Sequence, residues 1–349
     1  MARRRKKSKK RIWLILILLV LIGFGGFYLF NNFDEVKEKV TEEPIKKLKI
    51  VDEDSKTRPI AVMINNNHVA WPHAGLNDAY LAYEILAEGG ITRIMALFKD
   101  KDTEKIGSVR SARPYYLDYA LENDAIYVHY GWSDKAKSDI SSLGVDNING
   151  LTASSVFWRD SSLNKATEHT VFTSMKKINE YSKEHGYDRD TDKDLLLNYS
   201  VDEIDLSKRE DAIKADTVFM KYSYYTTASY EYDSEKKVYK RYMSDTPHVD
   251  AVTGDQYTFK NIIITPIETH TYDSYGRLEL DNIGSGEGYF ITLGYAIPIT
   301  WSKDSRSSQT VYKNMDGEEI KVNDGNTFIQ ITPPSEDIKI EGKQEENNE

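Results

Sequence analysis

Residues 58–133 alternate between short apolar runs and segments of helical period, and this alternation limits the possible folds more than any other feature. The apolar runs predict strands at residues 60–64, 91–98, 105–109, 125–130 and 145–148. The periodic segments predict helices at residues 77–88, 114–122, 133–143 and 173–185. Such a pattern is typical of an α/β (α+β) domain in which helices pack on a sheet. A hairpin at residues 98–105 would make that sheet mixed.

From about residue 216 the chain becomes rich in β-structure. Its apolar runs are short, and Gly, Asn and Asp interrupt them at intervals of roughly eight to twelve residues, the spacing of a small sandwich or barrel. We therefore predict an α/β domain at residues 57–215, followed by a smaller all-β, sandwich- or barrel-like domain at residues 216–334. The acidic tail at residues 335–349 is expected to be disordered.

The N-terminus combines a basic cluster with an apolar run. Residues 3–11 carry eight Lys or Arg side chains, and residues 12–30 are largely apolar. About twenty apolar residues can span a bilayer, and a basic flank stays in the cytoplasm. A cleaved signal peptide is the alternative, but no small-residue cleavage site follows the run. We predict a single-pass membrane protein with these parts: a cytoplasmic tail at residues 1–11, a single transmembrane helix at residues 12–30, a charged linker at residues 31–56, and the domains outside the cell.

This topology changes the charge of the exposed part. The chain contains 46 basic and 56 acidic residues, and without the eight bases of the N-terminus 38 face 56, a net charge of −18. So acidic a surface binds nucleic acid poorly, and any anion site must be a local cluster of arginines. The absence of cysteine excludes disulfides, thiolate catalysis and a lipid-modified cysteine. The sequence identifies no cofactor and no metal site.

The motif VRSARP contains the strongest candidates for ligand binding. Arg110, Ser111 and Arg113 lie between a predicted strand and a predicted helix that has Pro114 in its first turn. Free N–H groups at a helix N-terminus and planar guanidinium groups both suit phosphate or carboxylate. The alternative is that the two arginines pair with Glu84 or Glu88 and tie the helix to the sheet.

Other polar residues offer catalytic or binding groups. Glu84 and Glu88 would share one face of the predicted helix, either as general acid and base or as solvated or ion-paired side chains. His129, late in a predicted strand, is a third catalytic candidate or a satisfied core side chain. The remaining candidates for ligand binding are Asn65, Asn66, Arg93, Ser133, Arg159 and His169. Several follow predicted strands, whose ends in parallel sheets meet at a ligand-binding crevice, although Asn also suits turns.

Several of these motifs resemble a known family. The segments RPIAVMINN, EGGITR, GSVRSARP and HYGWS, with YKRYMSDTPHVD in the second half, resemble the YerB-like lipoproteins of Gram-positive bacteria, a family of unknown function. The resemblance covers residues 57–334 and implies two domains outside the membrane. Lipoprotein members carry a lipidated cysteine, which the predicted anchor replaces here. A weaker resemblance, to the LytR–CpsA–Psr phosphotransferases, implies Arg93, Arg110, Arg113 and Asp118 as counterparts of residues around a lipid pyrophosphate.

The sequence therefore predicts a membrane-anchored protein of the bacterial cell envelope that binds an anionic or glycan ligand on its α/β domain. Cell-wall glycan and polyprenyl phosphate are the candidate ligands. The alternative is an envelope enzyme acting on glycan or polyprenyl-phosphate substrates. In that case Arg110 and Arg113 would bind phosphate, and Glu84 or Glu88 would act as a base or hold a metal.

Overall fold

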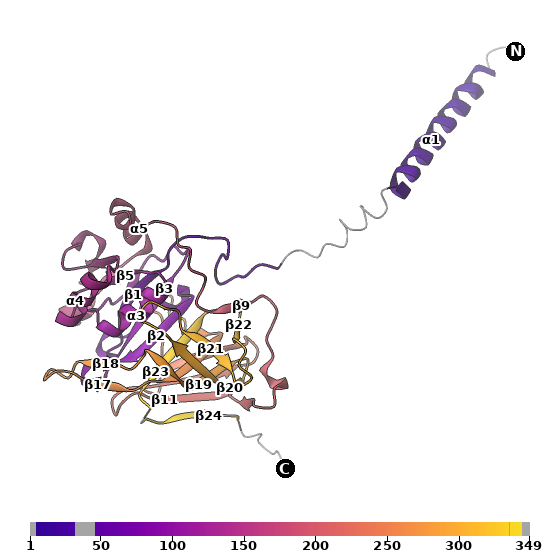
Figure 1. Cartoon of the computed structure of the whole chain (residues 1–349). Helices are drawn as coiled ribbons and strands as arrows, with labels where there is room; N and C mark the ends of the chain where they lie inside the picture. The colour runs from indigo at the N-terminus through magenta and orange to yellow at the C-terminus, as the bar shows by residue number, and fades with distance from the viewer. Residues whose placement is uncertain (1–4, 32–45, 335, 344–349) are drawn as a thin grey trace. The chain divides into compact units, whose positions relative to one another are not determined.

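The computed structural model describes residues 5–31, 46–334 and 336–343. The chain divides into two compact units, Met1–Lys47 and Leu48–Glu349. The first contains helix α1 (Arg5–Asn31) (Figure 1). Among the described residues, no helix combines the length and the apolar character needed to cross a bilayer. The predicted transmembrane helix therefore finds no support here.

The second unit is built on one sheet of eleven strands. Their order is β10-β20-β19-β16-β23-β2-β3-β1-β5-β6, with β21 beside β20. The strands are β1 (Ile60–Asn65), β2 (Leu81–Leu86), β3 (Thr92–Phe98), β5 (Ile126–His129), β6 (Asn147–Asn149), β10 (Ile213–Lys214), β16 (Asn261–Pro266), β19 (Gly284–Thr292), β20 (Tyr295–Lys303), β21 (Val311–Asn314) and β23 (Thr327–Thr332). The sheet is mixed, as predicted, because β1 runs parallel to β5 and antiparallel to β3.

Four smaller sheets complete the strands. A six-stranded sheet contains β11 (Thr217–Lys221), β12 (Thr227–Asp233), β13 (Val238–Met243), β14 (Thr246–Pro247), β15 (Thr258–Phe259) and β24 (Ile338–Glu341). The other three contain β4 (Ile106–Gly107), β7 (Trp158–Arg159) and β8 (Val171–Thr173); β9 (Asn198–Ser200) and β22 (Lys321–Asn323); and β17 (Thr269–Thr271) and β18 (Leu278–Leu280).

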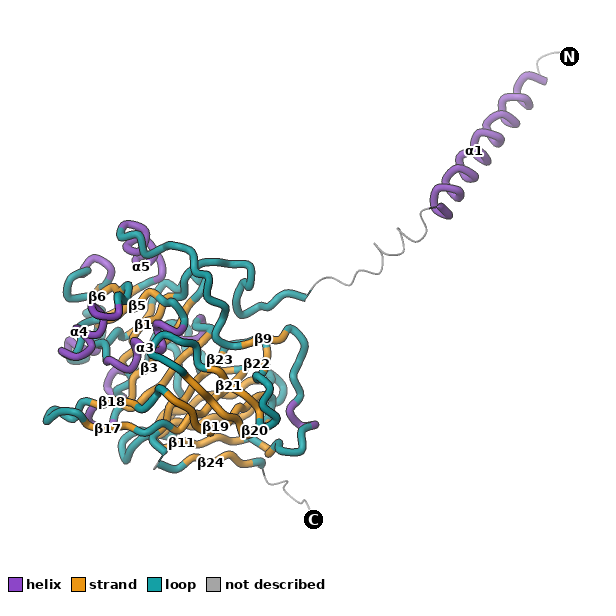
Figure 2. Tube along the Cα trace, in the orientation of Figure 1, coloured by secondary structure: helices purple, strands orange, loops and turns teal. Residues whose placement is uncertain are grey.

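The helices of this unit gather on the side that holds β1, β5 and β6 (Figure 2). They are α3 (Pro114–Glu122), α4 (Asp134–Leu143) and α5 (Met175–Glu184), with 3₁₀ turns η1 (His68–Ala70), η2 (Leu76–Asp78), η3 (Glu88–Gly90), η4 (Ser154–Val156), η5 (Thr167–His169) and η6 (Leu206–Lys208). All three α-helices confirm the sequence prediction. Their starts carry local signals: Pro114 in the first turn of α3, and Ser133 and Ser174 as N-caps that accept backbone N–H bonds.

The predicted helix at residues 77–88 is instead strand β2. This strand lies between β23 and β3, and its first five side chains are buried. Leu, Ala and Glu favour helices in isolation, but full burial between two strands outweighs that local preference. The chain then turns at Gly89, which has φ 70°. Glu84 and Glu88 consequently do not share a helix face.

The boundary near residue 215 does not separate two compact bodies. Strand β23 pairs in parallel with both β2 and β16, so strands from the two predicted domains form one continuous sheet. The predicted small sandwich or barrel is therefore wrong as a separate body. Many of its strands are nevertheless found where the sequence indicated them, including the β12–β13 hairpin.

The structure also differs from the sequence prediction at a hairpin, in the C-terminal tail and in the linker. Strand β4 pairs with β8 rather than with β3, so the predicted hairpin at residues 98–105 is wrong. In the tail predicted to be disordered, β24 pairs with β11. In the predicted linker, the Asp324 carboxylate accepts the backbone N–H of Lys49 at 2.9 Å, and Val51 is buried, so the chain joins the folded unit before residue 56. Residues 32–45 of that linker lie outside the described residues.

Candidate functional site

Four arginines predicted to bind ligand lie close together, and we call them the arginine cluster: Arg93, Arg110, Arg113 and Arg159. Arg93 opposes Asn65 across the β1–β3 pair, and its Nη1 donates to the carbonyl of Ser111. The backbone N–H of Arg110 donates to Met63 O at 2.9 Å, which holds the VRSARP loop against β1. The loop thus brings guanidinium groups from two separate segments to one place.

The carboxylate of Glu88 is the main counter-ion of this cluster. Arg113 donates to it through two nitrogens, one at 2.9 Å, and Arg93 Nη2 lies 3.5 Å away. Burial raises the pKa of Glu88, but the two arginines outweigh burial and leave that pKa below its usual value. Of the two arginines in the alternative, Arg113 pairs with Glu88, whereas Arg110 forms no ion pair with Glu84 or Glu88 among the described residues. Arg93 joins Arg113 at Glu88.

The cluster keeps an excess of positive charge. In the part of the chain that the structure describes, the Arg110 guanidinium donates a single long hydrogen bond, 3.4 Å, to the carbonyl of Glu168, and Arg159 donates to Thr167 O. Burial and the charge of Arg113 lower the pKa of Arg93 to about 10, and its Nε is buried without a partner. Within the described ranges, the carboxylates that act on Arg93 and Arg110 are those of Glu88 and Glu168, so the four guanidiniums of the cluster outnumber them. This is an arrangement that an added anion would stabilise.

Three predicted site residues have structural roles instead. His129 is fully buried, with Nδ1 2.7 Å from Gly131 O and Nε2 3.1 Å from Asn147 Oδ1, and burial lowers its pKa to about 4. The Ser133 hydroxyl caps α4 by accepting from the N–H of Ala136 at 3.3 Å. The Ser111 hydroxyl donates to Tyr130 O at 3.0 Å.

Glu84, a predicted catalytic residue, lies in the centre of a buried network. It pairs with Arg241 of β13, and both side chains are 0% exposed. The same carboxylate accepts from Thr92 Oγ1 at 2.6 Å and from Asn66 Nδ2 at 2.8 Å. Asn66 Oδ1 in turn accepts from the indole of Trp71. Glu84 and Asn66 therefore hold the two halves of the unit together rather than face solvent.

A chain of two imidazoles continues this network, and its hydrogen-bond directions follow from its ends. His73 Nε2 must donate to Asn65 O, at 2.7 Å, because a carbonyl only accepts. His73 Nδ1 then accepts from His248 Nε2 at 2.6 Å, and His248 Nδ1 accepts from Arg241. Both rings are neutral in this arrangement. Burial lowers the pKa of His73 to about 3 and lowers that of His248 well below its usual value.

Asn65 connects that network to the arginine cluster. Its Nδ2 lies 2.8 Å from Nδ1 of His169, so these two predicted ligand-binding residues contact each other. Burial and the charge of Arg110 lower the pKa of His169. Arg241 and His248 were not predicted as site residues. One signal was present, since Tyr239, Arg241 and Met243 alternate along β13 and all three point inward.

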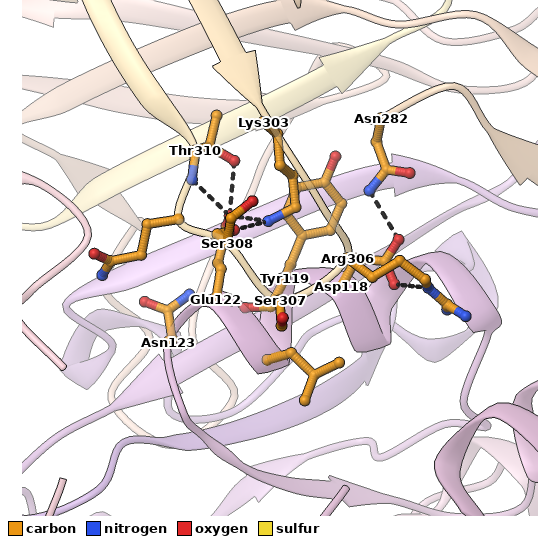
Figure 3. Close-up of polar contacts among 12 residues, drawn as sticks. Asp118, Tyr119, Glu122, Asn123, Asn282, Lys303, Arg306, Ser307, Ser308 and Thr310 are labelled. Carbon is orange, nitrogen blue, oxygen red and sulfur yellow. Dashed lines mark hydrogen bonds and ion pairs between the residues drawn. The ribbon is translucent and has the colours of Figure 1, made fainter. Parts of the chain in front are cut away.

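Asp118 of α3 faces a different cluster, shown in Figure 3. It pairs with Arg306 (2.6 Å) and accepts from Asn282 (3.1 Å). One turn further along α3, Glu122 pairs with Lys303 at 2.7 Å, and both side chains are almost fully buried. The implied grouping of Asp118 with the three arginines is therefore not found. This second cluster attaches α3 to the segment that joins β20 and β21.

Comparisons with known proteins match most of the chain. A family model described as "Protein of unknown function (DUF3048) N-terminal domain" matches residues 47–188, and its C-terminal counterpart matches residues 217–329. A relative named "Putative lipoprotein YerB", from Bacillus subtilis (strain 168), is 31% identical over 299 residues, which cover 84% of this chain and 87% of the relative. A crystal structure of the YerB protein from Bacillus subtilis matches with a TM-score of 0.72 and 29% identity, over 84% of this chain and 99% of that chain.

Proposed function

Because this chain belongs to the DUF3048 family and is similar to a Bacillus protein named "Putative lipoprotein YerB", we propose that it is an extracytoplasmic protein of the cell envelope that binds an anionic ligand. The binding site is the arginine cluster. The ligand group is a phosphate, pyrophosphate or carboxylate, such as an envelope glycan or a polyprenyl phosphate carries. The single observation that carries this proposal is the excess of guanidinium groups over carboxylates around Arg110.

The surroundings of Arg110 support an anion at this place. Its guanidinium is half-buried and makes one long contact with a carbonyl, so most of its N–H groups are available. Burial strengthens each charge interaction there, because fewer water molecules screen it. The rest of the folded unit is acidic overall, so a local basic site selects for a small charged group rather than for a polyanion.

The alternative, an envelope enzyme, receives less support from the geometry. Glu84 and His129 are 0% exposed, and Arg113 engages both oxygens of Glu88. A general base must reach the proton it removes. These three groups are occupied by protein partners. Catalysis would need either a rearrangement or other residues.

Replacing Arg110 with Ala is expected to weaken binding of inorganic pyrophosphate at least tenfold. A hydrogen bond to a charged group contributes about 1.5–3 kcal/mol, and 1.4 kcal/mol corresponds to tenfold. Isothermal titration calorimetry of the full chain in detergent measures this effect. Arg209→Ala is the matched control, because Asp211 and Asp316 already neutralise that arginine elsewhere on the unit. Equal affinities of wild type and Arg110→Ala, or no binding at all, would contradict the proposal.

The proposed location outside the cell requires a segment that attaches the protein to the membrane, and α1 is the candidate. The large apolar side chains described along α1, including Trp13 and Phe24, are at least 49% exposed. Surface of this kind is normally covered by lipid or by another protein. We therefore propose that residues 12–30 attach the chain to the membrane as a single pass and leave the folded unit outside the cell. The basic residues at 3–11 would stay in the cytoplasm.

Deleting residues 2–31 is expected to move the protein from the membrane fraction to the soluble fraction. The apolar run is the only proposed attachment, since the chain has no cysteine to carry a lipid. Immunoblots of fractionated cells measure the shift, and protease added to intact protoplasts should cleave the full-length protein. A full-length protein that stays soluble or resists the protease would refute this topology.

A further inference from the structure

A cavity of about 410 Å³ lies between the segment that follows β1 and the loop that joins β11 to β12. Its volume is within the range of about 300–1,000 Å³ that is typical of small-molecule sites. Asn67, His68 and Trp71 come from the first segment, and Tyr225 and Thr226 come from the loop. The cavity shares no residue with the arginine cluster. A ligand in this cavity would therefore bind independently of the proposed anion site.

The wall that carries Tyr225 is fixed in place by the main sheet. The hydroxyls of Ser223 and Thr226 both donate to Gly90 O, at 2.5 and 2.8 Å. A Cβ at Gly90 would lie 3.0 Å from the Ser223 hydroxyl and 3.3 Å from the Tyr225 ring, and Gly90 has φ 75°, so glycine is favoured at this close approach. The Tyr225 ring itself is 58% exposed. An aromatic surface is thus held open at the mouth of the cavity.

The lining contributed by the segment after β1 is aromatic as well, and it is also held by hydrogen bonds. The Trp71 indole donates to Asn66 Oδ1 at 3.1 Å, and Asn66 is anchored by Glu84 and Thr92. The two walls therefore come from opposite halves of the chain. The buried network that joins these halves reaches the cavity through Asn66, which belongs to both the network and the cavity lining.

The chemical character of the lining defines the ligand class. No Lys, Arg, Asp or Glu is among the described residues that line the cavity. Hydrogen-bonding groups remain on Asn67, His68 and Ser244, around two aromatic surfaces. A pyranose ring matches this combination, because its C–H face packs on aromatic rings while its hydroxyls bond to amide, imidazole and hydroxyl groups. We propose that the cavity binds a neutral sugar unit of an oligosaccharide.

Tyr275 and Tyr225 provide a matched pair for the test. Both residues are exposed, at 78% and 58%, but of the two only Tyr225 lines the cavity. Tyr225→Ala is expected to weaken binding of chitotetraose or maltotetraose about tenfold, whereas Tyr275→Ala changes it less than twofold. Calorimetry of the full chain measures both. The detergent must be zwitterionic, since a glycoside headgroup would compete for the cavity.

The outcomes separate this proposal from the anion site. Loss of sugar binding in Tyr225→Ala with unchanged pyrophosphate binding supports it. No binding of either oligosaccharide to the wild type overturns it, as does an equal loss in both tyrosine variants. Arg110→Ala provides the reciprocal control, with unchanged oligosaccharide binding expected. Because Tyr225 is exposed, both variants should keep the unfolding temperature of the wild type.

Discussion

Replacement of Arg241 with Met is expected to lower the free energy of unfolding by about 3–5 kcal/mol, because it leaves a buried carboxylate without its counter-ion. Glu84 and Arg241 are both fully buried. Without the guanidinium, Glu84 keeps only the hydroxyl of Thr92 and the amide of Asn66 as donors. His248 also loses the N–H that its Nδ1 accepts.

Chemical denaturation of the full chain measures this loss. Lys240→Met is the matched control, since Lys240 is the preceding residue of β13 and pairs with Asp233 at the surface. Its unfolding midpoint should stay close to that of the wild type. The double variant Glu84→Gln with Arg241→Met should recover part of the loss, because it removes the uncompensated charge. Equal midpoints for Arg241→Met and Lys240→Met would show that the buried pair contributes nothing.

Lys303→Met should also lower the free energy of unfolding, by about 3 kcal/mol. This is the lower end of the range expected for Arg241→Met. Glu122 would lose its cation but would keep three donors. The hydroxyl and N–H of Thr310 lie at 2.7 and 3.1 Å (Figure 3), and Tyr83 Oη lies at 2.7 Å. Thermal unfolding followed by circular dichroism should show a decrease in Tm of roughly 5–10 °C.

Arg306→Met serves as the comparison for that variant. Arg306 lies in the same segment and pairs with Asp118 and Asp139, but its side chain is 35% exposed. Solvent weakens such pairs, so its Tm should decrease less than that of Lys303→Met. The reverse order would mean that the partly exposed pair, rather than the buried one, attaches α3 to the strands.

Elements whose signals are local could be predicted from the sequence. Pro114, Ser133 and Ser174 mark helix starts within one turn of the chain, and the three helices begin there. Strand β2 could not be recognised, because its neighbour β23 lies about 240 residues further along the chain. A segment that favours helices locally becomes a strand when such a distant partner buries it.

In the candidate site, too, residues with local sequence signals could be predicted, whereas residues that depend on distant partners could not. Arg110 and Arg113 were found through the VRSARP motif, whose chemistry is contained in a few residues. The role of Glu84 was missed, because its partner Arg241 is 157 positions away and no local pattern connects them. Trp71 and Tyr225 could not be predicted from the sequence for the same reason. The cavity that both residues line exists only after the two halves of the chain have folded together.

The position of β23 has a consequence for how the protein is made. Strand β2 leaves the ribosome early, but its second neighbour consists of residues 327–332, close to the end of the chain. Until those residues emerge, one edge of an apolar strand has no partner, and such edges promote aggregation. Completion of the sheet therefore cannot precede synthesis of residues 327–332. For the export proposed above, this order means that the polypeptide can reach the far side of a membrane before its fold closes.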